Sequence, residues 1–442
     1  MKFDIGIRAD WAVTMAGGKA HVEKNLFFGI SKSNIALVSP WKLSLKKSCR
    51  KFIYQKNSVA LPGFVNGHAH LAMTLFRGIE DDLPLHTWLF ERIFPLEKKL
   101  VTKNFVKTGT ELAALECIRF GVTTVCDMYF YSQESAKVWD KAGLRGTFAQ
   151  VFASALLPED KDLGADKEKL FLSLYKKYEK HPRIRPSVGP HAPYTCSDEL
   201  LRKTAELSKK YSVPLQIHLS ETAEEVQTSK TKLGISPVER LSKLAVLSPH
   251  TICAHGVHLD NKDIEIMKKS GASIVYNPDS NAKLASGIAP IPKYLAAKIP
   301  VALGTDGSAS NNDLSLFGAM DLGTKLQKVH SGTTTAMTAK QALYMATLGG
   351  AKAIGLGDQI GSLEVGKAAD LILIDLQFPH LQPLNNLISH LVYSAQGLEV
   401  DTVFCHGKLL MRNKKILSLK PEAIYKKLEI IQHKISKQLG LL

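Results

Sequence analysis

From about residue 59 the chain repeats one pattern, in which a short apolar run ends in polar or small residues and a longer stretch of helical periodicity follows. Parallel strands alternating with helices produce this pattern. Residues 104–120 and 198–211 have the spacing of helices with one apolar face. Eight apolar runs predict an α/β fold, a closed (β/α)8 barrel of the TIM type. The expected strands span residues 59–66, 122–128, 145–153, 184–191, 214–220, 251–256, 272–278 and 300–306.

The two ends of the chain follow a different pattern. Residues 1–57 and 361–442 contain short β-rich runs that are punctuated by Gly, Asn and other polar residues. Within the second segment, residues 421–439 place apolar side chains at spacings of three and four, as on an amphipathic helix. We expect this helix to pack on its own domain. The N- and C-terminal strands are predicted to join in one small β-sandwich beside a barrel of residues 58–360.

Composition and charge narrow the class of protein. The 442 residues are 45% hydrophobic and 22% charged, as in soluble globular proteins, so a large core can form. No run approaches the roughly 18 apolar residues of a membrane span, and six cysteines are scattered without a CxxC pair. Both features predict a cytoplasmic protein without a membrane partner. The net charge of +16 comes mostly from dispersed lysines, which favours a solvated surface over a nucleic-acid partner.

Histidines and an aspartate stand near the ends of the expected barrel strands. His68 and His70 lie two apart on an extended chain, so both can face one ion. His218 lies in the fifth run, and Asp306 closes the eighth. Because barrel active sites form at the carboxyl ends of the strands, these four side chains should converge and hold one divalent ion. Nitrogen and oxygen ligands suit zinc, with iron or manganese as alternatives.

Glu221 and His255 are candidates for proton transfer at the same end of the barrel. Glu221 comes three residues after His218, just past the strand, where its carboxyl group could face a water molecule at the metal. Alternatively, it could be a surface carboxylate at the start of the next helix. His255 ends the sixth run and, if it is not a ligand, could orient the attacking water or polarise the group under attack.

Several segments together resemble the amidohydrolase superfamily, and within it the methylthioadenosine and S-adenosylhomocysteine deaminases. These segments are PGFVNGHAHLAMTLFRGIEDDLPLHTWL, GPHAPYTCS, HLSET, NPDSNAKLASGIAPI, GTDGSASNNDL and IGSLEVGKAADLILID, in that order. The resemblance implies hydrolytic conversion of an adenine ring to hypoxanthine, with loss of ammonia, in methylthioadenosine, S-adenosylhomocysteine or adenosine. Guanine or other purine deaminases and triazine hydrolases resemble the same scaffold and remain alternatives.

The resemblance also assigns roles around the ring. It implies that the three histidines and Asp306 are the metal ligands, and that Asp306 also takes a proton from the attacking water. Glu221 would protonate the ring nitrogen beside the carbon under attack. His255 would steer the attack on that carbon.

Further roles concern the sugar and its substituent. The resemblance places Glu97 at the ribose hydroxyls, His191 at the nucleoside and Arg145 at the distal end of the substrate. A carboxylate can accept two hydrogen bonds from a diol, and an arginine suits a carboxylate tail. Residues 146–180 contain no second arginine, only lysines such as Lys167. Since lysine lacks the planar fork of arginine, we expect methylthioadenosine to be a better substrate than S-adenosylhomocysteine.

One alternative comes from a different class of protein. The chain could be a catalytically silent relative that serves as a binding or structural protein. The presence of every expected ligand and of Glu221 disfavours this alternative. The expected partner is therefore a small nucleoside, and a homo-oligomer is compatible with the sequence.

Overall fold

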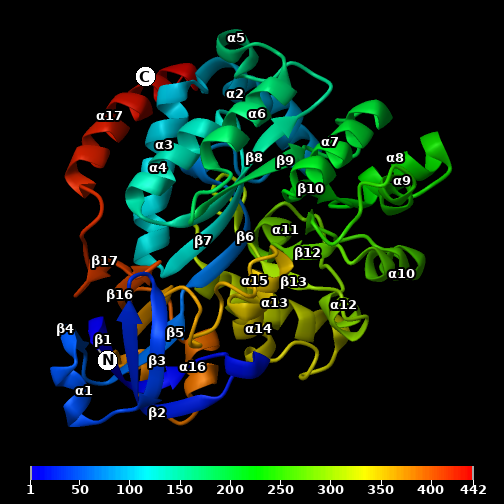
Figure 1. The fold of residues 1–442 in the computed structure, drawn as a ribbon. Coiled ribbons are helices and arrows are strands. Elements are labelled where there is room, and N and C mark those ends of the chain that lie inside the picture. Colours follow the sequence, from blue (N-terminus) through cyan, green and yellow to red (C-terminus); the bar gives the residue numbers. More distant parts are fainter. Residues whose placement is uncertain (1, 441–442) are drawn as a thin grey trace.

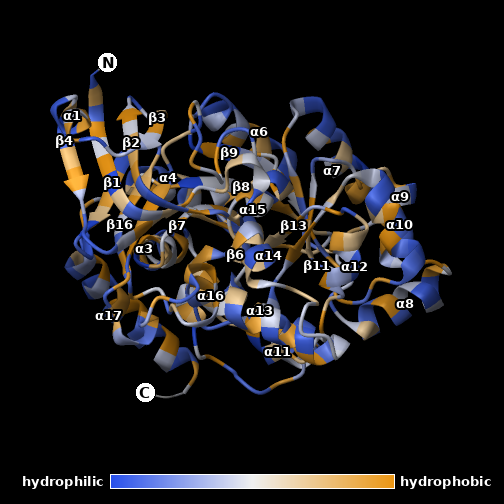
Figure 2. Ribbon diagram, turned by 90° about the horizontal axis from the view of Figure 1, so that it is seen from below, coloured by the Kyte–Doolittle hydropathy of each residue, from blue (hydrophilic) through white to orange (hydrophobic). Residues whose placement is uncertain are grey.

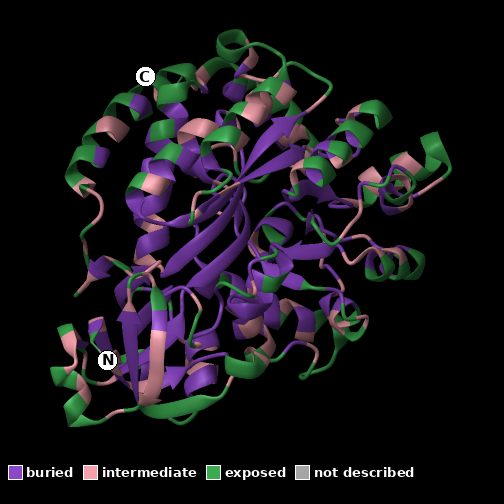
Figure 3. Ribbon diagram, in the orientation of Figure 1, coloured by how far each residue is buried: buried purple, intermediate pink, exposed green. Residues whose placement is uncertain are grey.

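The computed structural model describes residues 2–440 and contains two sheets of nine strands each. One sheet curls into a barrel, and the other is built from both ends of the chain and lies beside it (Figure 1). Figure 3 shows the barrel strands buried within a layer of helices whose outer faces are exposed. No helix within the described residues is long and apolar enough to cross a bilayer.

The barrel strands pair in chain order, each parallel to the next. The eighth strand is divided into two parts. Val301–Leu303 pairs with β12, and Asp306–Gly307 pairs with β6, where Asp306 lies opposite Ala69. The sheet therefore closes on itself, and the predicted (β/α)8 barrel is confirmed. Its strands are β6 (Phe64–His70), β7 (Val122–Met128), β8 (Arg145–Phe152), β9 (Ile184–Pro190), β10 (Leu215–Leu219), β11 (Thr251–His255), β12 (Ser273–Tyr276), β13 (Val301–Leu303) and β14 (Asp306–Gly307).

The first expected strand, over residues 59–66, is wrong in its boundaries. It comprises β5 (Ser58–Pro62), which pairs with β15 in the terminal sheet, and the start of β6. The chain passes between the sheets at Gly63, where a Cβ would lie 2.2 Å from Thr123 Oγ1. Because both strands are buried along nearly their whole length, hydrophobicity alone does not show where one ends.

The N-terminal and C-terminal strands form two adjacent halves of the terminal sheet and meet at one antiparallel pair, in which Leu373 lies opposite Ala60. The strand order is β18-β17-β16-β15-β5-β1-β2-β3, and β4 also pairs with β1. Buried side chains of β1 to β3 share one core with those of β15 and β16, so both termini build one small β unit, as predicted. The remaining strands are β1 (Phe3–Val13), β2 (Val22–Ser31), β3 (Asn34–Pro40), β4 (Cys49–Tyr54), β15 (Leu371–Asp375), β16 (Val400–Cys405), β17 (Lys408–Arg412) and β18 (Lys415–Ile416).

Helices cover the outside of the barrel, and hydrophilic and hydrophobic residues alternate along them (Figure 2). The two internal helices expected from periodicity are α3 (Lys103–Arg119) and α7 (Asp198–Tyr211). The C-terminal helix α17 (Pro421–Gln438) packs along α3 and buries Ile424, Ile431 and Ile435, so its apolar face is covered by its own chain. The others are α1 (Leu43–Lys47), α2 (Phe94–Leu100), α4 (Ser132–Ala142), α5 (Asp160–Leu163), α6 (Lys167–Tyr178), α8 (Ala223–Leu233), α9 (Pro237–Lys243), α10 (Asn261–Ser270), α11 (Pro278–Lys283), α12 (Ile291–Ala296), α13 (Leu316–Ser331), α14 (Ala339–Met345), α15 (Leu348–Ala353) and α16 (Leu387–Tyr393), with shorter helical turns η1 (Ala16–Gly18), η2 (Leu71–Phe76), η3 (Thr87–Ile93) and η4 (Pro379–Leu381).

Candidate active site

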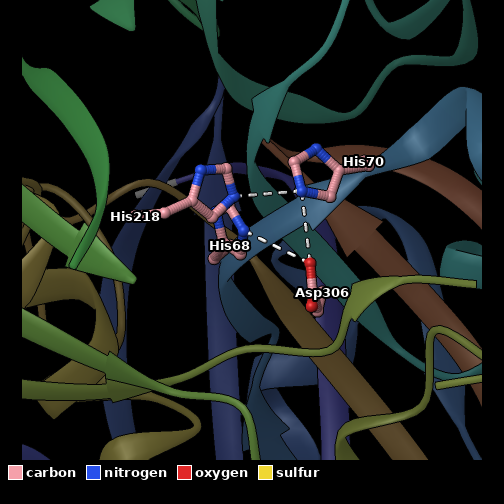
Figure 4. A group of neighbouring side chains, drawn as sticks. All are labelled: His68, His70, His218 and Asp306. Atoms are coloured by element: carbon pink, nitrogen blue, oxygen red, sulfur yellow. Dashed lines mark hydrogen bonds and ion pairs between the residues drawn. The ribbon is translucent and has the colours of Figure 1, made fainter. Parts of the chain in front are cut away.

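Four side chains from β6, β10 and β14 meet at the carboxyl ends of these strands (Figure 4). One donor atom from each of His68, His70, His218 and Asp306 lies within 4.8 Å of the others. Asp306 Oδ1 is 3.4 Å from His68 Nε2 and 3.2 Å from His70 Nε2. The Nε2 atoms of His70 and His218 are 3.3 Å apart. Two ligands of one tetrahedral zinc ion are separated by about 3.4 Å, so these spacings fit a single ion.

Backbone carbonyls orient two of the imidazoles. His70 Nδ1 lies 2.5 Å from the carbonyl oxygen of Met128, and His218 Nδ1 lies 2.6 Å from that of His191. A carbonyl accepts the Nδ1 proton, which leaves the lone pair of Nε2 free for a metal. His68 Nε2 is buried and makes no hydrogen bond of normal geometry with residues 2–440. A bound ion would satisfy this nitrogen, whose burial without a partner is otherwise unfavourable.

One carboxylate oxygen of Asp306 faces the histidines, and the other faces two hydroxyl groups. Its Oδ2 accepts hydrogen bonds from Ser280 Oγ at 2.6 Å and from Ser310 Oγ at 3.2 Å. Burial alone would raise the pKa of Asp306, but the close imidazoles of His68 and His70 outweigh it and hold the pKa well below its usual value. The group is therefore a carboxylate at neutral pH, and its charge suits a cation at the centre of the cluster.

Glu221 and His255 lie beside the four-residue cluster. Glu221 Oε2 is 3.6 Å from His255 Nε2, and Glu221 Oε1 is 3.4 Å from Ser286 Oγ. Burial, followed by the negative charge of Asp306, raises the pKa of Glu221 to about 8, so this carboxyl group can carry a proton near neutral pH. Burial lowers the pKa of His255 to about 4, which keeps its imidazole neutral. Asn281 Nδ2 holds the ring at 3.0 Å from Nδ1.

A cavity opens from this cluster and is lined mainly by apolar and aromatic side chains, with a few polar groups. Such a lining is typical of a small-molecule site. Glu97 and His191 both line it. Tyr129 donates a hydrogen bond of 2.7 Å to Glu97 Oε1. Burial raises the pKa of Glu97 to about 7, although the Tyr129 hydrogen bond opposes the shift, and burial lowers the pKa of His191 to about 3.

Arg145 does not lie at this cavity, so its predicted place at the distal end of the substrate is corrected. It is the first residue of β8, whereas Val151 near the other end lines the cavity. Six residues of strand separate the two positions, roughly 20 Å. Arg145 is buried and binds Asp370 of the terminal sheet, with Nε 2.9 Å from Oδ2, and donates to the carbonyl of Pro182 at 2.8 Å. Its charge is used to join the barrel to the terminal sheet.

Arg145→Ala is expected to lower the free energy of unfolding by roughly 3–5 kcal/mol, because it leaves the carboxylate of Asp370 buried without its partner. Urea denaturation measures this change. Lys141→Ala, at an exposed position of α4, serves as the control and should change stability by less than about 0.5 kcal/mol. If the variant had a raised KM for a carboxylate-bearing substrate and no loss of stability, Arg145 would instead be a substrate-binding residue.

Three side chains of the site were missed by the sequence analysis. Tyr129 directly follows β7, so the rule that barrel sites lie after strand ends would have found it. Ser280 and Ser310 lie in segments that carry the family resemblance, but nothing in their spacing shows that both reach Asp306. Asp306 and His255 have positive φ angles of 64° and 74°, a sparsely populated conformation that often occurs at functional sites.

Comparison with known proteins places the chain among deaminases and their relatives. The amidohydrolase family matches residues 59–410. A 5-methylthioadenosine/S-adenosylhomocysteine deaminase of Syntrophobacter fumaroxidans is 45% identical over 377 residues, which are 85% of this chain and 86% of that relative. A 5'-deoxyadenosine deaminase of Methanosphaera stadtmanae is 42% identical over 376 residues, or 85% and 88% of the two chains. The solved structure of an adenosine deaminase from Xanthomonas campestris with bound zinc has a TM-score of 0.94 and 32% identity, covering 99% of both chains.

Proposed function

The chain belongs to the amidohydrolase family, and on this premise we propose that it is a metal-dependent deaminase of adenine nucleosides that carry an uncharged 5′ group. Its preferred substrate is then 5′-methylthioadenosine, with S-adenosylhomocysteine as a poorer one. The observation that carries the proposal is the cluster of three histidines and Asp306 beside Glu221, within a largely apolar cavity. The names of relatives that are 42–45% identical over most of the chain support the reaction and the nucleoside.

We propose that the four clustered side chains hold one divalent ion, with zinc as the first choice and iron or manganese as alternatives. Their nitrogen and oxygen donors support this assignment, as do their mutual spacing and the Nε2 atom of His68, which makes no hydrogen bond of normal geometry within residues 2–440. The zinc in the adenosine deaminase structure supports the choice of metal. Such an ion supplies Lewis acidity, which lets a water molecule lose a proton near neutral pH.

The remaining steps are proton transfers by residues of this chain. Asp306 accepts a proton from the attacking water while Glu221 protonates the ring nitrogen beside the carbon under attack, and the neutral His255 orients that attack. The carbon then carries a hydroxyl and an amino group. Asp306 returns its proton to the amino group, which leaves as ammonia, and Glu221 takes the hydroxyl proton. The base is then hypoxanthine, still bonded to the ribose, and both carboxyl groups regain their starting states.

The proposed preference among nucleosides follows from the lining of the cavity. Phe94, Phe130 and Val151 are among its lining residues, and among the described residues no lysine or arginine lines it. Lys167, a lysine that the sequence offered for a carboxylate tail, is bound to Glu159 and Asp160. A methylthio group can therefore be accommodated, while a homocysteine carboxylate would lose water without gaining a cationic partner.

A substrate panel tests this function. The zinc-loaded protein is expected to release ammonia from 5′-methylthioadenosine and 5′-deoxyadenosine, with a lower kcat/KM for S-adenosylhomocysteine. Adenosine, guanine and an aminotriazine complete the panel. Turnover of guanine or the triazine alone would favour the alternative activities, and metal binding without turnover of any nucleoside would overturn the proposal. Less than one metal ion per chain after zinc supplementation would favour a silent binding protein.

We propose that Glu97 accepts hydrogen bonds from the ribose hydroxyls and that His191 contacts the nucleoside. Since the pKa of Glu97 is about 7, the carboxylate form gains population as the pH rises from about 6 to about 8. The ratio of kcat/KM for 5′-methylthioadenosine over its 2′-deoxy analogue should then rise about tenfold over this range. The pH dependence of the chemical steps cancels in this ratio. Glu97→Gln should abolish the rise, and a rise that persists would exclude Glu97 as its source.

We propose a cytoplasmic location, which the six free cysteines support. A small nucleoside is the proposed partner. A homo-oligomer and the lack of a nucleic-acid partner stay predictions from the sequence.

A further inference from the structure

The turn that carries Glu221 leaves the barrel by an unusual backbone path. Strand β10 ends at Leu219, and Ser220 has a φ of 48°, in the left-handed region that few residues other than glycine adopt. On one side the carbonyl of Ser220 accepts hydrogen bonds from the backbone N–H groups of Val257 and His258, each at 3.0 Å. These bonds tie the turn to the segment that follows His255.

On the other side, the turn is held by the carboxylate of Glu225. Glu225 Oε1 accepts a hydrogen bond from the backbone N–H of Ser220 at 2.9 Å, and Oε2 accepts one from the backbone N–H of Glu221 at 2.8 Å. Burial raises the pKa of Glu225 to about 7, although these two backbone hydrogen bonds oppose the shift because they favour the carboxylate, whose hydrogen bonds are stronger than those of a neutral group. Glu225 is itself fixed at the start of α8, because its N–H donates to Thr222 Oγ1 at 3.1 Å. Consecutive peptide groups are thus clamped by one side chain.

We infer that Glu225 is a positioning residue, which aims Glu221 at the substrate by fixing the peptide that carries it. This inference rests on the proposed role of Glu221 in proton transfer. Among the described residues, the side chain of Glu221 has only distant partners, Ser286 at 3.4 Å and His255 at 3.6 Å. Its direction is therefore set mainly by its backbone. A displacement of about 1 Å at a reacting group can lower a rate about 100-fold.

Glu225→Gln is the test. Glutamine offers one accepting oxygen and an amide that only donates, so one of the two backbone N–H groups loses its partner. We expect kcat for 5′-methylthioadenosine to fall about 10- to 100-fold while KM stays within about twofold. Glu224→Gln, at the exposed neighbouring position on the same helix, is the matched control and should behave as wild type. An equal loss in both variants, an unchanged kcat, or a variant that fails to fold would overturn the inference.

Two further measurements separate this inference from the proposed function. If Glu225 acts only through Glu221, Glu225→Gln should lower kcat little in a protein that already carries Glu221→Gln. If the two residues act independently, the two fold-losses in kcat would multiply. A crystal structure of Glu225→Gln should show the carboxyl group of Glu221 displaced, whatever the substrate is. Glu221 in its original place would refute the positioning role even if the deaminase activity is established.

Discussion

Glu221→Gln is expected to lower kcat for 5′-methylthioadenosine by about 10²- to 10⁴-fold, the usual contribution of a group that transfers protons in the transition state. Glutamine has nearly the same shape and can still make a hydrogen bond with the ring nitrogen, but it cannot deliver a proton to it. The pKa of Glu221, raised to about 8 by burial and by Asp306, is what suits the native carboxyl group to this task. Steady-state kinetics under saturating substrate measure the change.

The same variant should keep its metal and its fold, since Glu221 is not one of the four clustered side chains. Metal analysis and thermal unfolding check both. Glu224→Gln is again the appropriate control, because it makes the same substitution at an exposed position of the adjoining helix. A kcat within about tenfold of wild type would show that another group carries the proton. Loss of metal from the variant would instead place Glu221 within the metal site.

The barrel could be predicted because each strand is a buried apolar run followed by polar residues. β7 and α7 have the bounds expected from the sequence, Val122–Met128 and Asp198–Tyr211. The boundary at Gly63 could not be predicted in the same way, because β5 and β6 are both buried and differ only in the sheet they join. Hydrophobic periodicity thus reports burial, but it does not report which neighbour covers a strand.

The convergence of distant side chains followed from one rule, that barrel residues after strand ends share one face. The rule brought His68, His218 and Asp306 together without knowledge of the loops. The prediction for Arg145 was wrong because this residue begins its strand. It therefore lies at the end of the barrel opposite the active site, where it binds Asp370. The clamp by Glu225 was equally beyond the sequence, since it depends on a left-handed turn at Ser220 that no residue pattern indicates.

His68→Ala should remove both the activity and the stabilisation that zinc provides. In the wild-type protein, zinc at 100 times its dissociation constant should raise the free energy of unfolding by about 2.7 kcal/mol, because it binds the folded chain. In the variant this gain should be largely lost, and deamination should fall more than about 10³-fold. The control is His250→Ala, which removes an exposed histidine that is not one of the four clustered side chains.

The comparison between these two variants distinguishes a metal site from a hydrogen-bonded cluster. If His68, His70 and Asp306 served only to hold one another, zinc would stabilise neither protein, and His68→Ala would be destabilised with or without metal. If they bind an ion, zinc stabilises the wild-type protein but not His68→Ala, so the difference in stability between the two proteins is larger with zinc than in a chelator. This zinc-dependent part of the difference ties the cluster to the metal rather than to the fold alone.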